Sequence, residues 1–322
     1  MSAPLTRAGA LAALGGALAG PALVRPAAAQ APATIKLALI PIEPTCQAYY
    51  AQENGFFEKA GLDVQVAVSQ STPAIAAAIL SGTYDIAYST VSTLATAHSK
   101  GLPVTIIAPG GLINSSTPKP IAGIVVGAGT GIQNAKDFNG KTFGTSALNT
   151  LAEYVPRAWV DKHGGDSNTI KFVEIPFPAI PDALASGRID GGYLVEPFLS
   201  IALKGGAKFL NTGEDAIAPV YLASCWYATT PWVKAHPDLV TRFAGAMAEA
   251  GKWANANPAK VVPIIANHLK SDPAVLASTT RTVFADRLVA AQIQPWIDVT
   301  ARYAKFPPFP AAELVYVPSG KA

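Results

Sequence analysis

The chain has 322 residues, of which 50% are hydrophobic, and its 24 Lys and Arg residues against 21 Asp and Glu give a formal net charge of +3 at pH 7. That excess is small and scattered along the chain, so the basic patch needed by a nucleic-acid-binding protein is missing and this class is excluded. A chain of this length can bury a large core and commonly divides into two lobes.

The N-terminus has the layout of a secretory signal. Arg7 precedes a run of Ala, Leu and Gly at 8–24, and an Ala-Ala-Ala sequence at 27–29 offers a small-residue cleavage site. The run is short for a membrane span, is interrupted by Gly and Pro, and is followed by no basic stop-transfer cluster. We therefore expect a signal peptide at 1–29 and a mature chain that begins near Gln30. Because no cysteine is near the cleavage site, we expect a freely diffusing periplasmic protein without attached lipid.

From residue 35 onward, strand-like and helix-like stretches alternate. Strands are expected at 35–42, 64–68, 85–88 and 104–108, and helices at 46–60, 73–81 and 90–100. Thr72 and Pro73 supply a helix cap and a proline at the first helical position, while Gly82 and Gly101 end two of the helices. This alternation predicts a mostly parallel sheet with helices on both faces.

A second α/β series follows a break in the pattern. Residues 109–120 are rich in Gly, Asn, Ser, Thr and Pro and are expected to cross to a second lobe, and residues 211–219 are expected to return. The strands and helices expected from the first crossing onward are strands 121–126, 141–144, 170–175, 191–195, 207–210 and 221–229, and helices 150–163 and 179–186. From residue 231 helical patterns dominate and are punctuated by prolines, Pro295 among them.

Catalytic and cofactor motifs are not visible in the sequence. Cys46 and Cys225 are far apart and form no metal motif; an exported protein could pair them, but two small buried residues are the simpler interpretation. The histidines fall in no metal-ligand spacing: His98, His163, His236 and His268. There is no Gly-x-Ser-x-Gly elbow, and the glycines at 127–131 lack the dinucleotide spacing. We expect no enzyme activity, no cofactor and no metal.

Four stretches, taken in order, carry a family resemblance. They are 54–64 (NGFFEKAGLDV), 81–87 (SGTYDIA), 137–141 (DFNGK) and 185–190 (ASGRID) with 195–198 (VEPF). Each stretch alone occurs in many folds, but their order and spacing cover nearly all of the mature chain. In this the chain resembles the nitrate/sulfonate/taurine and thiamin-pyrimidine class of periplasmic solute-binding proteins, which serve ABC importers.

The resemblance implies a type II periplasmic binding fold, an α/β protein whose two lobes are joined by two crossings. Each lobe is a mixed, mostly parallel sheet flanked by helices, and the lobes close over ligand. Lobe one would comprise residues 31–112 plus 222–322, and lobe two residues 113–221. The implied partners are a small-molecule ligand and an importer permease with its ATPase, and we expect a monomer.

Two other functions stay open. One is an enzyme like the thiamin-pyrimidine synthases, although the resemblance associates that activity with a cysteine-rich motif and a cytosolic setting. The other is a ligand-sensing receptor subunit, which would normally work with a membrane sensor.

The candidate binding residues lie in loops at the expected carboxyl ends of strands, where helix N-termini offer free N–H groups. These loops are 41–47, 69–72, 88–90, 145–150, 176–179 and 195–198. From them, and from the strand 221–229, the expected ligand-binding residues are Glu43, Thr45, Ser71, Thr72, Tyr88, Ser89, Thr90, Asn149, Thr150, Phe177, Glu196 and Trp226. The hydroxyl and amide residues are also ordinary helix caps and the aromatic residues ordinary core, so both interpretations remain.

The same loops predict the chemistry of the ligand. They contain two acids, Glu43 and Glu196, and no Lys or Arg. Two carboxylates oppose an anion such as nitrate, so a ligand with an amino or ring N–H group that bonds to Glu196 is favoured, with Phe177 or Trp226 over a ring face. We expect a nitrogen-containing organic solute, such as a pyrimidine precursor or a taurine-like compound with its sulfonate at the helix start near Thr150.

Overall fold

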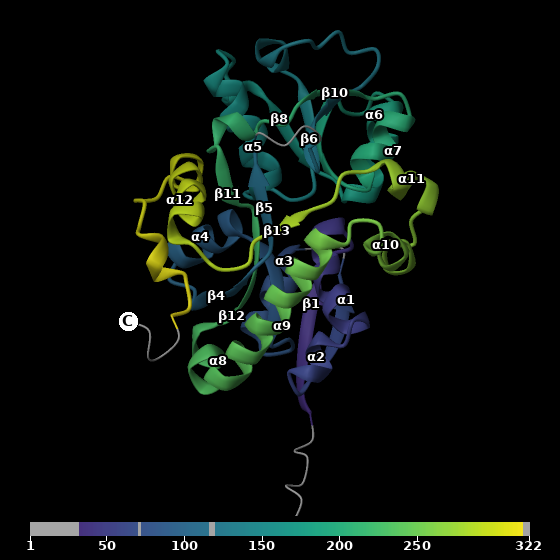
Figure 1. Cartoon of the computed structure of the whole chain (residues 1–322). Coiled ribbons are helices and arrows are strands. Elements are labelled where there is room, and N and C mark those ends of the chain that lie inside the picture. Colours follow the sequence, from purple (N-terminus) through teal and green to yellow (C-terminus); the bar gives the residue numbers. More distant parts are fainter. Residues whose placement is uncertain (1–31, 70–71, 116–119, 318–322) are drawn as a thin grey trace, which may run out of the picture. The chain divides into compact units, whose positions relative to one another are not determined.

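The computed structural model describes residues 32–69, 72–115 and 120–317 (Figure 1). The described residues belong to one compact unit. The expected signal peptide and Ser71 lie outside the described residues. None of the described helices is both long enough and apolar enough to cross a membrane.

The first sheet combines strands from both ends of the chain. Its strands are β1 (Ala33–Leu39), β2 (Leu62–Val68), β3 (Ile86–Thr90), β4 (Val104–Pro109) and β12 (Ser224–Thr229), in the order β2-β1-β3-β12-β4. β1 is parallel to β2 and β3, with Ala33 opposite Leu62, whereas β12 is antiparallel to both β3 and β4. The late strand β12 is therefore inserted between two early strands.

The helices between these strands follow the expected order with one correction. They are α1 (Cys46–Glu53), α2 (Phe56–Lys59), α3 (Thr72–Leu80) and α4 (Val91–Ser99). The single helix expected at 46–60 is broken in two, because Gly55 takes a left-handed conformation with φ 70° between α1 and α2. A glycine adopts that conformation without the steric penalty that a side chain would bring.

The second sheet is built from the middle of the chain. Its strands are β6 (Ala122–Val126), β7 (Thr142–Thr145), β8 (Lys171–Glu174), β9 (Gly191–Val195) and β10 (Lys208–Asn211), in the order β10-β6-β9-β7-β8. Its helices are α5 (Leu151–Lys162), α6 (Ile180–Ala185) and α7 (Phe198–Lys204). β6 is antiparallel to β9 and β10, while β7 is parallel to β8 and β9. Each sheet is thus mixed and mostly parallel, with helices packed on it, as expected.

A third, small sheet was not expected. It consists of β5 (Gly111–Asn114), β11 (Val220–Leu222) and β13 (Val283–Phe284), in the order β11-β5-β13, and its pairs are antiparallel. The strand expected at 221–229 is consequently two strands, β11 and β12, separated at Ala223. These strands are short and contain little hydrophobic alternation, so only tertiary pairing reveals them.

The C-terminal part is helical, apart from β13. Its helices are α8 (Thr230–Ala235), α9 (Pro237–Ala256), α10 (Val261–Leu269), α11 (Pro273–Ser278) and α12 (Ala290–Ala304). Pro295 lies inside α12 and does not end it. α9 packs on α1 and β4, and α12 packs on α4 and β11 (Figure 1). Short 3-10 helices occupy Glu43–Thr45, Ala135–Phe138, Ser167–Thr169, Phe177–Ala179, Glu214–Ala216 and Ala311–Glu313.

Candidate functional site

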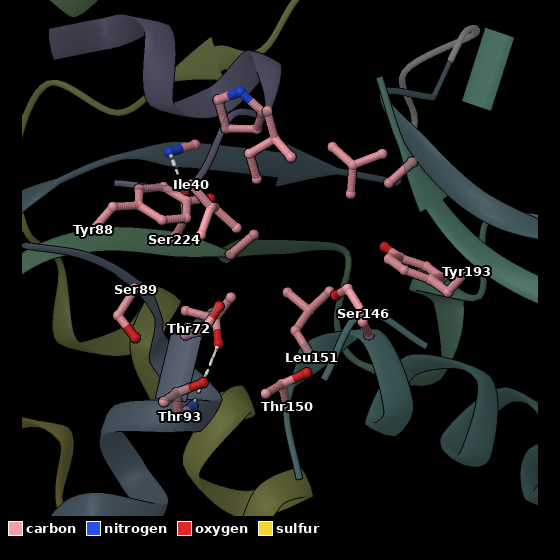
Figure 2. A pocket seen from close by; sticks show the side chains of 18 of the residues that line it. Ile40, Thr72, Tyr88, Ser89, Thr93, Ser146, Thr150, Leu151, Tyr193 and Ser224 are labelled. Atoms are coloured by element: carbon pink, nitrogen blue, oxygen red, sulfur yellow. Dashed lines mark hydrogen bonds between the residues drawn. The ribbon is translucent and has the colours of Figure 1, made fainter. Parts of the chain in front are cut away.

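A cavity of about 80 Å³ lies at the carboxyl ends of parallel strands from both large sheets (Figure 2). Its wall includes residues that follow β1 in the first sheet and β7 in the second, and residues in the carboxyl-terminal parts of β3 and β9. This is the position at which open α/β sheets bind ligands. The residues of the wall are Ile40, Ile42, Pro44, Thr72, Tyr88, Ser89, Thr90, Thr93, Gly111, Ile113, Ile121, Ala122, Ser146, Ala147, Thr150, Leu151, Ala152, Phe177, Tyr193, Val195, Tyr221, Ala223, Ser224 and Thr282.

The cavity wall combines hydroxyl groups with apolar surface. In the part of the chain that the structure describes, no Asp, Glu, Lys, Arg or His belongs to this wall. Transferring an ion from water to such a place is costly unless a counter-charge or several hydrogen bonds compensate. The wall therefore favours an uncharged ligand that makes a few directional hydrogen bonds.

Helices α4 and α5 are among those that start at the cavity. Thr90 precedes α4, and its Oγ1 accepts a hydrogen bond from the Thr93 N–H at 3.4 Å. Thr150 holds the corresponding position before α5, but its hydroxyl donates to the carbonyl oxygen of Ala147 at 2.8 Å and caps no N–H group. The free N–H groups of a helix start carry partial positive charge, so both starts favour hydrogen-bond acceptors on a ligand.

The structure brings about half of the expected binding residues to the cavity. Those in the wall are Thr72, Tyr88, Ser89, Thr90, Thr150 and Phe177. Those that the structure describes outside the wall are Glu43, Thr45, Asn149, Glu196 and Trp226. The ligand contacts of all these residues remain predictions.

Glu196 serves the start of α7. Its carboxylate accepts hydrogen bonds from the backbone N–H of Ser200 at 3.1 Å and from the Ser200 hydroxyl at 2.8 Å. Burial raises the pKa of Glu196, and the two bonds from Ser200 act in the opposite direction. The role that this geometry shows for Glu196 is therefore at the helix start, outside the described cavity wall.

Glu43 ties three parts of the chain together beside the cavity. Its carboxylate accepts hydrogen bonds from the hydroxyl and from the backbone N–H of Thr282, the latter at 3.1 and 3.3 Å to the two oxygens. Its own N–H donates to the carbonyl oxygen of Glu196 at 3.2 Å. Burial raises the pKa of Glu43 to about 7, although the bonds from Thr282 and the nearby Arg281 lower it. Glu43 thereby positions Thr282, which is part of the wall.

Thr45, Trp226 and Asn149 have structural surroundings of their own. The Thr45 hydroxyl lies 2.8 and 2.7 Å from the carbonyl oxygens of Ile40 and Ile42, which fixes the loop that enters the wall. Trp226 is fully buried, and its indole N–H donates to Gln47 Oε1 at 2.8 Å. Asn149 is exposed and has a left-handed φ of 59°.

Several wall residues were not predicted from the sequence. Tyr193 and Val195 are two residues apart on β9 and thus share a face, a signal that could have identified Tyr193. Tyr221 and Ser224 belong to the unexpected junction between β11 and β12. Thr282 precedes β13 in a region with a helical pattern, and no local signal marks it.

The described residues contain no group of three or more His, Cys, Asp or Glu side chains that could hold a metal ion. Cys46 and Cys225 are buried free thiols, in agreement with their interpretation as small core residues.

Known proteins share this fold and part of this sequence. A Staphylococcus aureus structure, described as the ligand-binding component of an ABC-type import system, superposes with a TM-score of 0.76 at 19% identity over 88% of this chain and 96% of that chain. A Brucella abortus protein described as a binding protein is 25% identical over 241 residues, 72% of this chain and 70% of its own. The formylaminopyrimidine-binding protein of Halalkalibacterium halodurans is 23% identical over 220 residues, 67% of this chain and 64% of its own.

The structural similarity confirms the type II periplasmic binding fold. The family model described as NMT1/THI5 like matches residues 45–261, and the chain belongs to this family.

Proposed function

We propose that the protein is the extracytoplasmic substrate-binding component of an ABC import system, which captures a small organic solute in the cavity. The observation that carries this proposal is the cavity itself, whose wall is shared between the strand ends of both large sheets. The names of the relatives in the family support the same function. Export to the periplasm, a monomeric state and delivery to a permease with its ATPase are parts of the proposal.

Capture would work by closure of two lobes, residues 31–112 plus 222–322 and residues 113–221. The cavity would lie between these lobes, since it takes wall residues from both. Contacts between the described parts of these ranges include the Glu43 N–H to the Glu196 carbonyl oxygen at 3.2 Å and the Tyr303 hydroxyl to Asp161 Oδ2 at 2.8 Å. A ligand that contacts both lobes increases the population of the closed state only to the extent that it binds the closed state more tightly than the open state.

The solute is proposed to be a nitrogen-containing organic molecule. Because the described wall has no charged side chain, a neutral heterocycle such as a pyrimidine precursor fits better than taurine, whose ammonium and sulfonate would both lack a counter-charge. The volume of about 80 Å³ is smaller than the ~150 Å³ of a cavity that accommodates benzene. A six-membered ring would therefore require the walls to stand further apart than they do here.

Mass spectrometry of the gently purified, undenatured protein tests this function. We expect one small organic molecule per chain, released on unfolding. Ser146 is a half-buried wall residue, so Ser146→Trp should fill the cavity and prevent capture, whereas Ser99→Trp at an exposed position should not. A protein that carries no solute after contact with cell extract, or a Ser146→Trp variant that still carries it, would contradict the proposal.

A further inference from the structure

The hydroxyl of Thr150 has a fixed hydrogen-bonding polarity. A threonine hydroxyl has one proton and two lone pairs. Its proton is directed to the carbonyl oxygen of Ala147, at 2.8 Å, and the side chain belongs to the cavity wall. Toward a ligand, Thr150 can therefore act only as a hydrogen-bond acceptor as long as this bond persists.

Backbone donors lie directly beside this acceptor. The N–H groups of Glu153 and Tyr154 bond to the Thr150 carbonyl oxygen at 3.0 and 2.9 Å. The N–H groups of Leu151 and Ala152 have no hydrogen-bond partner among the described residues, and both residues line the cavity. Figure 2 shows Leu151 beside Thr150. A helix start leaves such groups for a cap or a ligand, and the Thr150 side chain does not cap them. The start of α5 thus offers an acceptor and N–H donors side by side.

An independent feature of the wall also points to a polar ligand. Ser89, at the end of β3, is 2% exposed, and its hydroxyl has no hydrogen-bond partner among the described residues. Buried polar groups in proteins are nearly always hydrogen-bonded, and Ser89 belongs to the cavity wall, so a ligand that reaches this hydroxyl would supply the missing partner. Unlike Thr150, Ser89 has both its proton and its lone pairs available.

We propose that Thr150 is a specificity-determining residue that selects an uncharged ligand with an N–H donor next to an acceptor. An amide, a lactam or an amino-substituted heterocycle has such an edge: its N–H would donate to Thr150 Oγ1, and its acceptor would receive a bond from the Leu151 or Ala152 N–H. The absence of charged side chains from the described wall favours a neutral ligand. This inference rests on the proposed binding function.

Two probes of equal ring size separate the donor from the rest of the ligand. 2-Pyrrolidinone has the adjacent N–H and C=O, whereas γ-butyrolactone has an ester oxygen in place of the N–H. Titrations of the solute-free protein, followed by NMR, should show that the lactam binds at least about tenfold more tightly than the lactone. The reason is that the lactone would place oxygen lone pairs against those of Thr150.

Variants test whether Thr150 is responsible. Thr150→Val keeps the shape and removes the acceptor, so the lactam preference should fall below about threefold, while Thr150→Ser should retain it. Thr169→Val is the matched control, because the Thr169 hydroxyl also donates to a carbonyl three residues earlier, Asp166, at 2.7 Å, but lies exposed and away from the wall. If Thr150→Val fails to fold, as judged by circular dichroism, Thr150→Ala replaces it.

Three results would overturn the inference: equal binding of the two probes by the wild type, no detectable binding of the lactam, or an unchanged preference without the Thr150 hydroxyl. If one of these occurs while the protein still captures a solute from extract, only the specificity assignment fails. If no solute is captured but the lactam preference holds, the transport function fails instead.

Discussion

Glu43→Gln should make the protein less sensitive to pH. Burial raises the pKa of Glu43 from its ordinary value of 4.5 to about 7, so the folded state binds a proton that the unfolded state has already released. The stability that this carboxyl contributes is complete below pH 4.5 and is lost as the pH rises through about 7. A pKa raised from 4.5 to about 7 corresponds to roughly 3 kcal/mol of unfolding free energy.

The assay is urea unfolding at about pH 5 and about pH 8, with the free energy extrapolated to water. Glutamine cannot ionise, and its amide oxygen can still accept the bond from Thr282. The unfolding free energy of Glu43→Gln minus that of the wild type should therefore be greater at about pH 8 than at about pH 5. The expected increase in this difference is up to roughly 3 kcal/mol. Part of the pH dependence should remain, because burial also raises the pKa of Glu214 to about 7. Glu58→Gln, at an exposed position, is the control. Parallel pH curves for Glu43→Gln and the wild type would refute this reasoning.

Three further outcomes follow from the same contacts. Trp226→Phe should cost about 1–3 kcal/mol of unfolding free energy, because Gln47 Oε1 loses its buried donor, but should leave ligand affinity nearly unchanged; a large affinity loss would show that Trp226 contacts the ligand. Phe177→Ala should weaken binding of the captured solute by about tenfold in calorimetry, since Phe177 lines the cavity; an unchanged affinity would remove it from the site. Cys46 and Cys225 should react with a thiol reagent only after unfolding, because both are fully buried and burial raises the pKa of both thiols; rapid reaction of the native protein would contradict the structure.

Local sequence signals located most strands of the two large sheets. The hydrophobic runs of β1 and β6 and the helix start at Thr72-Pro73 belong to elements whose patterns are visible in a few neighbouring residues. The small third sheet was missed because β5 and β13 are stabilised by partners distant in the sequence. Gly55 shows a related difficulty, since the apolar pattern continues across the position where the helix breaks.

The site was predicted less completely for a physical reason. Ser89 and Thr150 were predicted as wall residues because they lie in loops at expected strand ends. Sequence position alone could not predict whether a carboxylate points into the cavity. Glu43 and Glu196 are adjacent in sequence to wall residues, but their carboxylates accept hydrogen bonds from Thr282 and Ser200. The polar groups of the wall are therefore hydroxyl and backbone groups. The amino-acid composition of the loops alone did not predict this.

The most direct measurement of the central claim is small-angle X-ray scattering of the protein before and after removal of its captured solute. If two lobes close on the solute, its removal should increase the radius of gyration, and its return should restore the smaller value. Ser146→Trp, in which the cavity is blocked, should keep one value whether or not the solute is present. A wild-type radius of gyration that does not change with the solute, while mass spectrometry shows that the solute is bound, would contradict capture by closure.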